Sequence, residues 1–159
     1  MEPRKTATLR GTKPVETIDY DGLMRANAVR VFSERDPKHR LGAIRELYCA
    51  DAAVTEPEGV AKGEIAINDA VTELLSKLPP AFGFSPVGPA VGHHGVARLR
   101  WKAGPPNGPA AITGMDVAFF QGNRIQALYV FLDPAKLPER RPDLEVHDRS
   151  VIPDEDDAT

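Results

Sequence analysis

The feature of the sequence that most restricts the fold is a pair of apolar stretches separated by a three-residue turn. The first stretch covers Ile112–Phe120, the second covers Arg124–Leu132, and Gln-Gly-Asn lies between them. Both have the length of β-strands, and Gly122 and Asn123 readily adopt the positive φ angles that tight turns require. The pattern therefore predicts a β-hairpin, and Asp116 lies in the middle of its first strand.

Asp116 needs an explanation, because an ionised carboxylate is costly in an apolar site unless it is paired, hydrated or protonated. Side chains at even spacing share one face of a strand, so Asp116 lies on the same side as Ala118 and Phe120. The opposite side is also apolar, with Met115, Val117 and Phe119. We therefore expect both faces of the hairpin to be covered and Asp116 to be enclosed.

Length and composition point to one globular domain with a hydrophobic core. The chain has 159 residues, of which 42% are hydrophobic and 27% charged, as in ordinary globular proteins. The formal net charge of -3 and the lack of a basic patch argue against nucleic acid or an anionic membrane as a partner.

No segment approaches the roughly 20 apolar residues of a membrane-spanning helix. The single cysteine, Cys49, allows no internal disulfide, and with no secretory signal at the start we expect a cytoplasmic protein.

The chain divides into three parts by composition. We expect a polar, flexible arm at residues 1–16, a folded domain at residues 17–134, and a polar, flexible tail at residues 135–159 that is rich in proline and charge. Hydrophobic periodicity predicts helices at about residues 17–36, 36–52 and 63–80. Asp19 is a plausible cap of the first helix, and Pro37 suits the first turn of the second.

The second half of the domain changes to strand patterns. Residues 81–91 form a weak strand that Pro86 and Pro89 restrict to an edge or a bulge. Residues 95–103 alternate, with Arg98 and Arg100 on the side opposite Trp101. A short strand at about Ala53–Glu56 precedes the third helix. The order of elements predicts an α+β fold, in which about three helices pack on one face of a curved antiparallel sheet and close a cone with an internal pocket.

Two stretches resemble a known superfamily. Residues 47–67 read LYCADAAVTEPEGVAKGEIAI, and residues 114–133 read GMDVAFFQGNRIQALYVFLD. The first resembles the segment after the second helix in the nuclear transport factor 2-like superfamily, with its Ala-Asp-Ala turn, acid-Pro pair and Gly-x-x-Ala-Ile start of the third helix. The second resembles the last hairpin of the same superfamily. The resemblance covers about Leu23 to Asp133 and implies the cone-shaped, cystatin-like fold.

Within this superfamily, the resemblance is chemically strongest to ketosteroid isomerases and to SnoaL-like polyketide cyclases. Glu56 matches the general base of the isomerases. Asp116 matches the aspartate that the isomerases keep protonated and that the cyclases use as acid and base. Tyr48 stands where some isomerases carry a second tyrosine, but Ala28 stands where they place their main oxyanion donor.

These residues suggest acid/base chemistry without a metal or other cofactor. A desolvated Asp116 would stay protonated and donate a hydrogen bond, while a better solvated Glu56 would accept a proton next to a carbonyl group, helped by Tyr48. The substrate would be a small, flat, apolar carbonyl compound. The expected walls of its pocket, besides Ala97, are Leu99, Trp101, Phe120, Leu128 and Val130.

Other interpretations of the same residues remain open. Asp116 could pair with Arg98 or Arg100 of the neighbouring strand, which would remove the catalytic hypothesis. With Ala28 in place of the tyrosine, the chain could also be a non-catalytic ligand-binding or dimerisation domain. By analogy with the superfamily we expect a homodimer formed through the open face of the sheet.

Two remaining residue types carry weaker signals. His93 and His94 are adjacent in a predicted turn and point to opposite sides, and no third ligand follows at a diagnostic spacing, so we expect no metal site. One of them could still act as an acid or base in the pocket. Cys49 is expected to be a small buried side chain.

Overall fold

The computed structural model describes residues 17–135, which form three helical segments and one sheet. The predicted arm and all but the first residue of the predicted tail lie outside the described residues. The helical elements are α1 (Tyr20–Ala26), continued by the π-helical turn η1 (Asn27–Phe32), α2 (Pro37–Leu47) and α3 (Glu64–Ser76). The strands are β1 (Tyr48–Glu56), β2 (Gly59–Lys62), β3 (Gly83–His93), β4 (Val96–Gly104), β5 (Ile112–Gln121) and β6 (Arg124–Leu132).

The predicted helix starts agree with the structure. The side chain of Asp19 accepts a hydrogen bond from the backbone N–H of Gly22 at 2.9 Å, which caps α1. Pro37 occupies the first turn of α2, after a cap by Asp36. The end of α2 was predicted too late, because the helix stops at Leu47 and Tyr48 already begins β1. The run that follows contains β-branched residues and pairs with β6, so tertiary pairing determines its conformation.

The six strands form one mixed sheet in the order β2-β1-β6-β5-β4-β3. All neighbouring pairs are antiparallel except β1 and β6, which run parallel. The expectation of an antiparallel sheet is therefore correct for β3–β6 and wrong for the contact between β1 and β6. That contact joins two strands with α3 and β3–β5 between them in the sequence, and a period-2 pattern carries no information on such distant pairing.

Strand β3 is an edge strand with a bulge, as its prolines predicted. Its register against β4 shifts between Val87 and Val91. Gly88, with φ of 70°, lies between Pro86 and Pro89 in this irregular part. A proline lacks the N–H that a ladder needs, and an edge position tolerates this loss.

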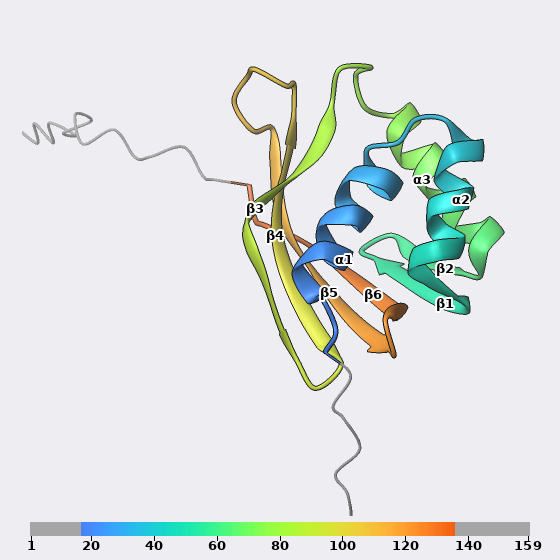
Figure 1. Ribbon diagram of the computed structural model, residues 1–159. Coiled ribbons are helices and arrows are strands. Elements are labelled where there is room, and N and C mark those ends of the chain that lie inside the picture. Colours follow the sequence, from blue (N-terminus) through green and yellow to red (C-terminus); the bar gives the residue numbers. More distant parts are fainter. Residues whose placement is uncertain (1–16, 136–159) are drawn as a thin grey trace, which may run out of the picture.

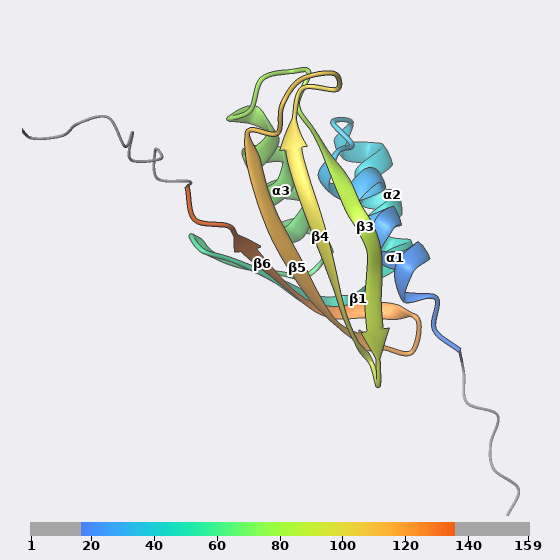
Figure 2. The same ribbon diagram turned by 90° about the vertical axis from the view of Figure 1, so that its left-hand side faces the viewer.

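The three helices cover one face of the curved sheet, and no element of the described chain covers the other face (Figures 1 and 2). The core lies between the helices and the inner face, and it includes Val31, Ile44, Val71, Leu99 and Leu128. The expectation that both faces of the hairpin are covered is wrong for this single chain. The outer face exposes large apolar side chains, namely Val87, Val91, Phe119, Tyr129 and Phe131.

Candidate functional site

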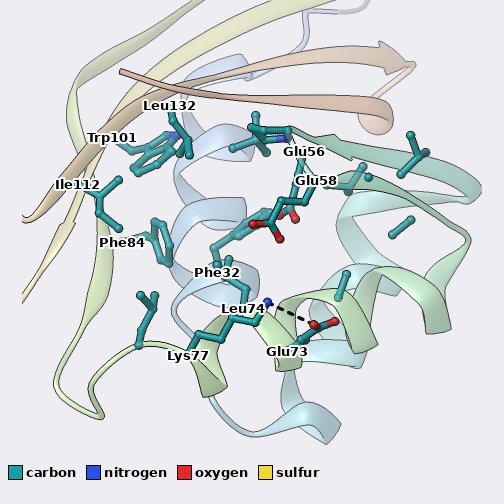
Figure 3. A pocket seen from close by; sticks show the side chains of 18 residues that line it. Phe32, Glu56, Glu58, Glu73, Leu74, Lys77, Phe84, Trp101, Ile112 and Leu132 are labelled. Atoms are coloured by element: carbon teal, nitrogen blue, oxygen red, sulfur yellow. Dashed lines mark ion pairs between the residues drawn. The ribbon is translucent and has the colours of Figure 1, made fainter. Parts of the chain in front are cut away.

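A cavity of about 470 Å³ opens between α3, the turn from β1 to β2 and the inner face of the sheet (Figure 3). Its inner wall contains the buried residues Phe32, Val54 and Trp101. Its mouth contains Val60 and Leu132, which are 66% and 53% exposed. The cavity is therefore an apolar recess with access to solvent, of a size that suits a small organic molecule.

Three aromatic rings form one wall of the cavity (Figure 3). The ring centroids of Phe32 and Phe84 lie 6.0 Å apart, and those of Phe84 and Trp101 lie 5.3 Å apart, both in edge-to-face geometry. The rings come from η1, β3 and β4. Such packing holds the rings rigid and leaves aromatic surface for a flat ligand.

Trp101 connects this wall to Asp116. The indole Nε1–H donates a hydrogen bond to Oδ1 of Asp116 at 2.8 Å. Trp101 lies directly opposite Gly114 in the β4–β5 ladder, and Asp116 follows two residues later on the same face. A Cβ atom at Gly114 would lie 2.4 Å from Cζ2 of Trp101. The glycine therefore makes room for the indole to cross β5 and reach the carboxylate.

Asp116 is not among the residues that line the cavity; it lies enclosed behind two that do, Trp101 and Val130, and it has no cationic partner among residues 17–135. It is 5% exposed, and the Trp101 N–H is the hydrogen-bond donor that reaches it within this range. Burial raises the pKa of Asp116 to about 7, against a smaller lowering by the Trp101 hydrogen bond and a further rise from the charge of Glu56. Arg98 and Arg100 are exposed on the outer face of β4, so the guanidinium pairing weighed from the sequence is absent. The carboxyl group can thus be present in both protonation states near neutral pH.

Glu56 lies at the cavity wall, half-buried at the end of β1. Burial raises its pKa, and the charges of Glu58 and Glu73 raise it further, while Lys77 acts in the opposite sense. Glu56 remains partly solvated, whereas Asp116 is almost completely enclosed. Two carboxyl groups with different environments therefore lie within electrostatic reach of each other.

Tyr48 is fully buried, and its hydroxyl group donates a hydrogen bond to Oδ1 of Asn27 at 2.6 Å. Burial raises its pKa well above the usual value, and the charge of Asp116 adds to the rise. Tyr48 is thus close enough to Asp116 to feel its charge, but it does not line the cavity. Ala28 is buried in the core beside this pair, on the same helical turn as Asn27.

Of the residues predicted as pocket walls, Trp101 and Val130 line this cavity. Leu99 and Leu128 are fully buried core residues, and Phe120 packs against Tyr20 with ring centroids 5.3 Å apart. The reason is that α1 fills the end of the cone where these three residues lie, whereas the cavity occupies the opposite end. Sequence reasoning missed four lining residues, Phe32, Phe84, Glu58 and Glu73, although Glu58 is only two residues from Glu56.

The remaining candidates lie away from the cavity. His93 and His94 sit in the β3–β4 turn with their Nδ1 atoms 3.0 Å apart, and His94 has a φ of 49°. Cys49 is partly buried on β1. Within residues 17–135, no group of three or more His, Cys, Asp or Glu side chains is placed to hold a metal ion. No helix in this range is both long and apolar enough to cross a membrane.

Solved structures with the same arrangement identify the architecture. A proposed isomerase of the SnoaL-like family from Agrobacterium tumefaciens aligns with 72% of this chain and 97% of its own, with a TM-score of 0.67 and 21% identity. A proposed polyketide cyclase from Sinorhizobium meliloti aligns with 69% of this chain and 93% of its own, with a TM-score of 0.54 and 17% identity. This chain has the nuclear transport factor 2-like fold. The predicted α+β class and superfamily fold are thereby confirmed.

A proposed ketosteroid isomerase from Kribbella flavida shares the nuclear transport factor 2-like fold over a longer stretch. It aligns with 86% of this chain and 91% of its own, with a TM-score of 0.56 and 12% identity. No family model matches the chain, and no curated protein sequence matches it. At these identities the likeness establishes the fold, and a function has to be argued from the site itself.

Proposed function

We propose that the protein is a SnoaL-like acid/base catalyst of the isomerase or cyclase type, which acts on a small apolar carbonyl compound without a cofactor. The observation that carries this proposal is Asp116, a carboxyl group enclosed beside a ligand-sized cavity, held by one indole N–H and free of any cation within the described chain. Burying such a group lowers the free energy of unfolding, and carboxyl groups whose pKa is strongly shifted by burial concentrate at functional sites.

The roles follow from the two environments. Protonated Asp116 would donate a hydrogen bond from Oδ2 to the carbonyl oxygen of the substrate, which gains negative charge as the enol forms. Ionised Glu56 would take a proton from the carbon next to that carbonyl group. In an isomerase the protonated Glu56 would return it to another carbon of the substrate; in a cyclase, where the enolate carbon attacks a second carbonyl group, it would return it to the oxygen of that group. The proton moves within the site, so the reaction needs no external acid, base or oxidant.

The shape of the cavity supports a flat substrate. The rings of Phe32, Phe84 and Trp101 form one wall, and Leu74 of α3 and Leu78, two residues after the end of that helix, also line the cavity. A planar molecule with a single ring, or with two or three fused rings, would bury its faces between these walls. Its polar atom would be directed to the inner end, next to Trp101 and Val130, which flank Asp116 on the inner face.

Two measurements test this proposal. A planar phenol of the naphthol type mimics the enol, and its fluorescence should report tight binding to the wild type and binding at least tenfold weaker to Asp116→Asn. On the correct carbonyl substrate, Glu56→Gln should lower kcat by several orders of magnitude. Phenol binding that does not depend on Asp116, or a loss of only a few-fold in Glu56→Gln, would remove these residues from their proposed roles.

A second candidate is a non-catalytic binding domain, and one observation favours it. Ala28 provides no hydroxyl group, and the hydroxyl proton of Tyr48 is already donated to Asn27. Of the three positions 28, 48 and 116, only Asp116 would therefore supply a side-chain donor to the oxyanion. A panel of flat enones and β-diketones, each followed for exchange of its α-protons with deuterated solvent, separates the candidates: a binder would show saturable affinity and no exchange above the background rate.

We further propose that the partner of the outer sheet face is a second copy of this chain. Exposed apolar side chains of β3, β5 and β6 lie there, with Arg98 and Arg100 of β4 between those of β3 and those of β5, and large apolar side chains exposed to water in this way are unfavourable. Phe131 on this face and Val29 on η1 are both 54% exposed, which makes them a matched pair. In sedimentation experiments Phe131→Lys should dissociate the dimer and Val29→Lys should leave it intact. A wild type that sediments as a monomer at micromolar concentration would contradict this assignment.

A further inference from the structure

We propose that the ligand of the cavity carries a positive charge on its flat body, and that Glu58 and Glu73 at the mouth recognise that charge. The inference deepens the proposed function, since it concerns the same cavity and names its substrate class: a flat carbonyl compound with an ammonium group on the side away from the carbonyl. It rests on the charged groups that line the cavity, which the acid/base proposal does not use.

The charged lining is strongly unbalanced. It contains three carboxylates, from Glu56, Glu58 and Glu73, and one ammonium group, from Lys77. Nζ of Lys77, the residue directly after α3, lies 3.3 Å from Oε1 of Glu73, four residues earlier in that helix. Across residues 17–135, neither Glu56 nor Glu58 forms an ion pair. The cavity therefore offers negative charge that the described chain does not neutralise.

The fold brings these carboxylates together from two elements. Glu56 and Glu58 flank Pro57 in the turn from β1 to β2, and Glu73 faces them from α3 (Figure 3). Their mutual repulsion is visible in Glu56, whose raised pKa has Glu58 and Glu73 as its causes after burial. A cation between the turn and α3 would relieve this repulsion and would keep Glu56 ionised, as a base must be.

The other polar atoms of the cavity region point to the same ligand. The indole N–H of Trp101 is already donated to Asp116, and the ammonium group of Lys77 is paired with Glu73. Asp116 lies behind Trp101 and Val130 and is not itself among the residues that line the cavity, and no hydrogen bond from residues 17–135 reaches its Oδ2. Apart from the acid proton of Asp116 itself, the site thus presents acceptors, and acceptors select a ligand that carries donors.

An organic cation fits this site better than a metal ion. The described residues contain no group of three or more acidic, His or Cys side chains arranged around one point. The aromatic wall of Phe32, Phe84 and Trp101 lies beside the carboxylates instead. Aromatic faces attract organic cations, and apolar walls bury the body that carries the charge. Lys77, exposed directly after the end of α3, would attract an anionic ligand only weakly, because its charge is already compensated by Glu73.

The experiment uses three naphthalene probes of equal shape: 2-naphthylmethylammonium, 2-naphthylmethanol and 2-naphthoate. Their dissociation constants are measured by fluorescence or calorimetry at low and high salt. We expect the cation to bind roughly tenfold more tightly than the alcohol and the carboxylate to bind most weakly, with differences that shrink as salt screens the charges. Glu58→Gln and Glu73→Gln should each reduce the preference for the cation several-fold and leave the affinity for the alcohol unchanged.

The control variant is Glu46→Gln, which removes an exposed carboxylate of α2 that does not line the cavity. It should leave all three constants unchanged. Equal affinity for the cation and the alcohol, or a preference that survives in the Glu58→Gln, Glu73→Gln double variant, would overturn the inference while leaving the acid/base proposal in place. Conversely, a cation preference that persists in Asp116→Asn would support the inference even if no substrate is turned over.

Discussion

The indole of Trp101 and the carboxylate of Asp116 form a buried pair across β4 and β5, with Nε1 and Oδ1 2.8 Å apart. The pair contains no cation, so the indole orients the carboxyl group without neutralising it. Burial therefore still dominates the pKa of Asp116, which lies at about 7. The second oxygen of Asp116, Oδ2, receives no hydrogen bond from residues 17–135.

The first prediction concerns the pH dependence of stability. The pKa of Asp116 rises from 3.8 to about 7 on folding, so between these values the folded state binds more protons than the unfolded state. The free energy of unfolding should therefore fall as pH rises through this window, by up to about 1.4 kcal/mol per pH unit, and level off above it. Asp116→Asn should remove this contribution.

Thermal unfolding of both proteins between pH 4.5 and pH 8.5 checks this prediction. The difference in Tm between Asp116→Asn and the wild type should grow in favour of the variant as pH increases. Parallel curves for the two proteins over the whole range would mean that Asp116 titrates normally.

Loss of the indole donor should shift the titration of Asp116. The Trp101 hydrogen bond lowers the pKa of Asp116 against the effect of burial, so Trp101→Phe should raise that pKa above its value in the wild type. Carbon-detected NMR of the labelled aspartate carboxyl groups measures it directly. Phe84→Leu, which perturbs the neighbouring ring without touching the hydrogen bond, should cause a smaller change.

Gly114 should tolerate no side chain. A Cβ atom there would lie 2.3 Å from the carbonyl oxygen of Phe131 and 2.4 Å from Cζ2 of Trp101. Gly114→Ala should therefore destabilise the protein by about 1–3 kcal/mol in chemical denaturation, as overpacking of a core does. Gly42 of α2 is the matched control, since nothing lies within 4 Å of its Cβ position. Gly42→Ala should be neutral or stabilising by up to about 1 kcal/mol.

The hydroxyl group of Tyr48 should matter more for stability than for turnover. Its removal in Tyr48→Phe leaves Oδ1 of the fully buried Asn27 without its donor, and Nδ2 of the same side chain already lacks an acceptor in the described chain. The expected cost is about 1–3 kcal/mol. On the correct substrate kcat should change only a few-fold. A loss of kcat comparable to that of Asp116→Asn would instead give Tyr48 a direct role in the reaction.

Local patterns were sufficient to predict most of the elements. The hairpin of β5 and β6, the cap at Asp19, the place of Pro37 in the first turn of α2 and the outward direction of Arg98 and Arg100 all follow from period-2 or period-3.6 spacing and from turn chemistry. Each of these signals depends on neighbours in sequence. Asp116 was recognisable for the same reason, since a carboxylate among apolar strand residues violates the local pattern.

The errors arise where distant segments meet. The early end of α2 at Leu47 and the parallel contact of β1 with β6 depend on tertiary pairing. The position of the cavity depends on which end of the cone α1 fills, so Leu99 and Leu128 became core residues while Phe32 and Phe84 became walls. Glu73 shares the cavity with Glu58 only because α3 folds back over β2, and no spacing in the sequence encodes that proximity.

The bulge and the two prolines of β3 also limit how copies of this chain can associate. A neighbouring molecule that tried to extend the sheet at this border would meet a broken ladder, with two backbone donors missing at Pro86 and Pro89 and a kink at Gly88. Growth into a continuous inter-molecular sheet is thereby blocked on this side. Copies of the chain can still pack side chain against side chain through the outer face of the sheet. Such a contact is complete once one partner covers the face, so it favours a finite complex over a fibre.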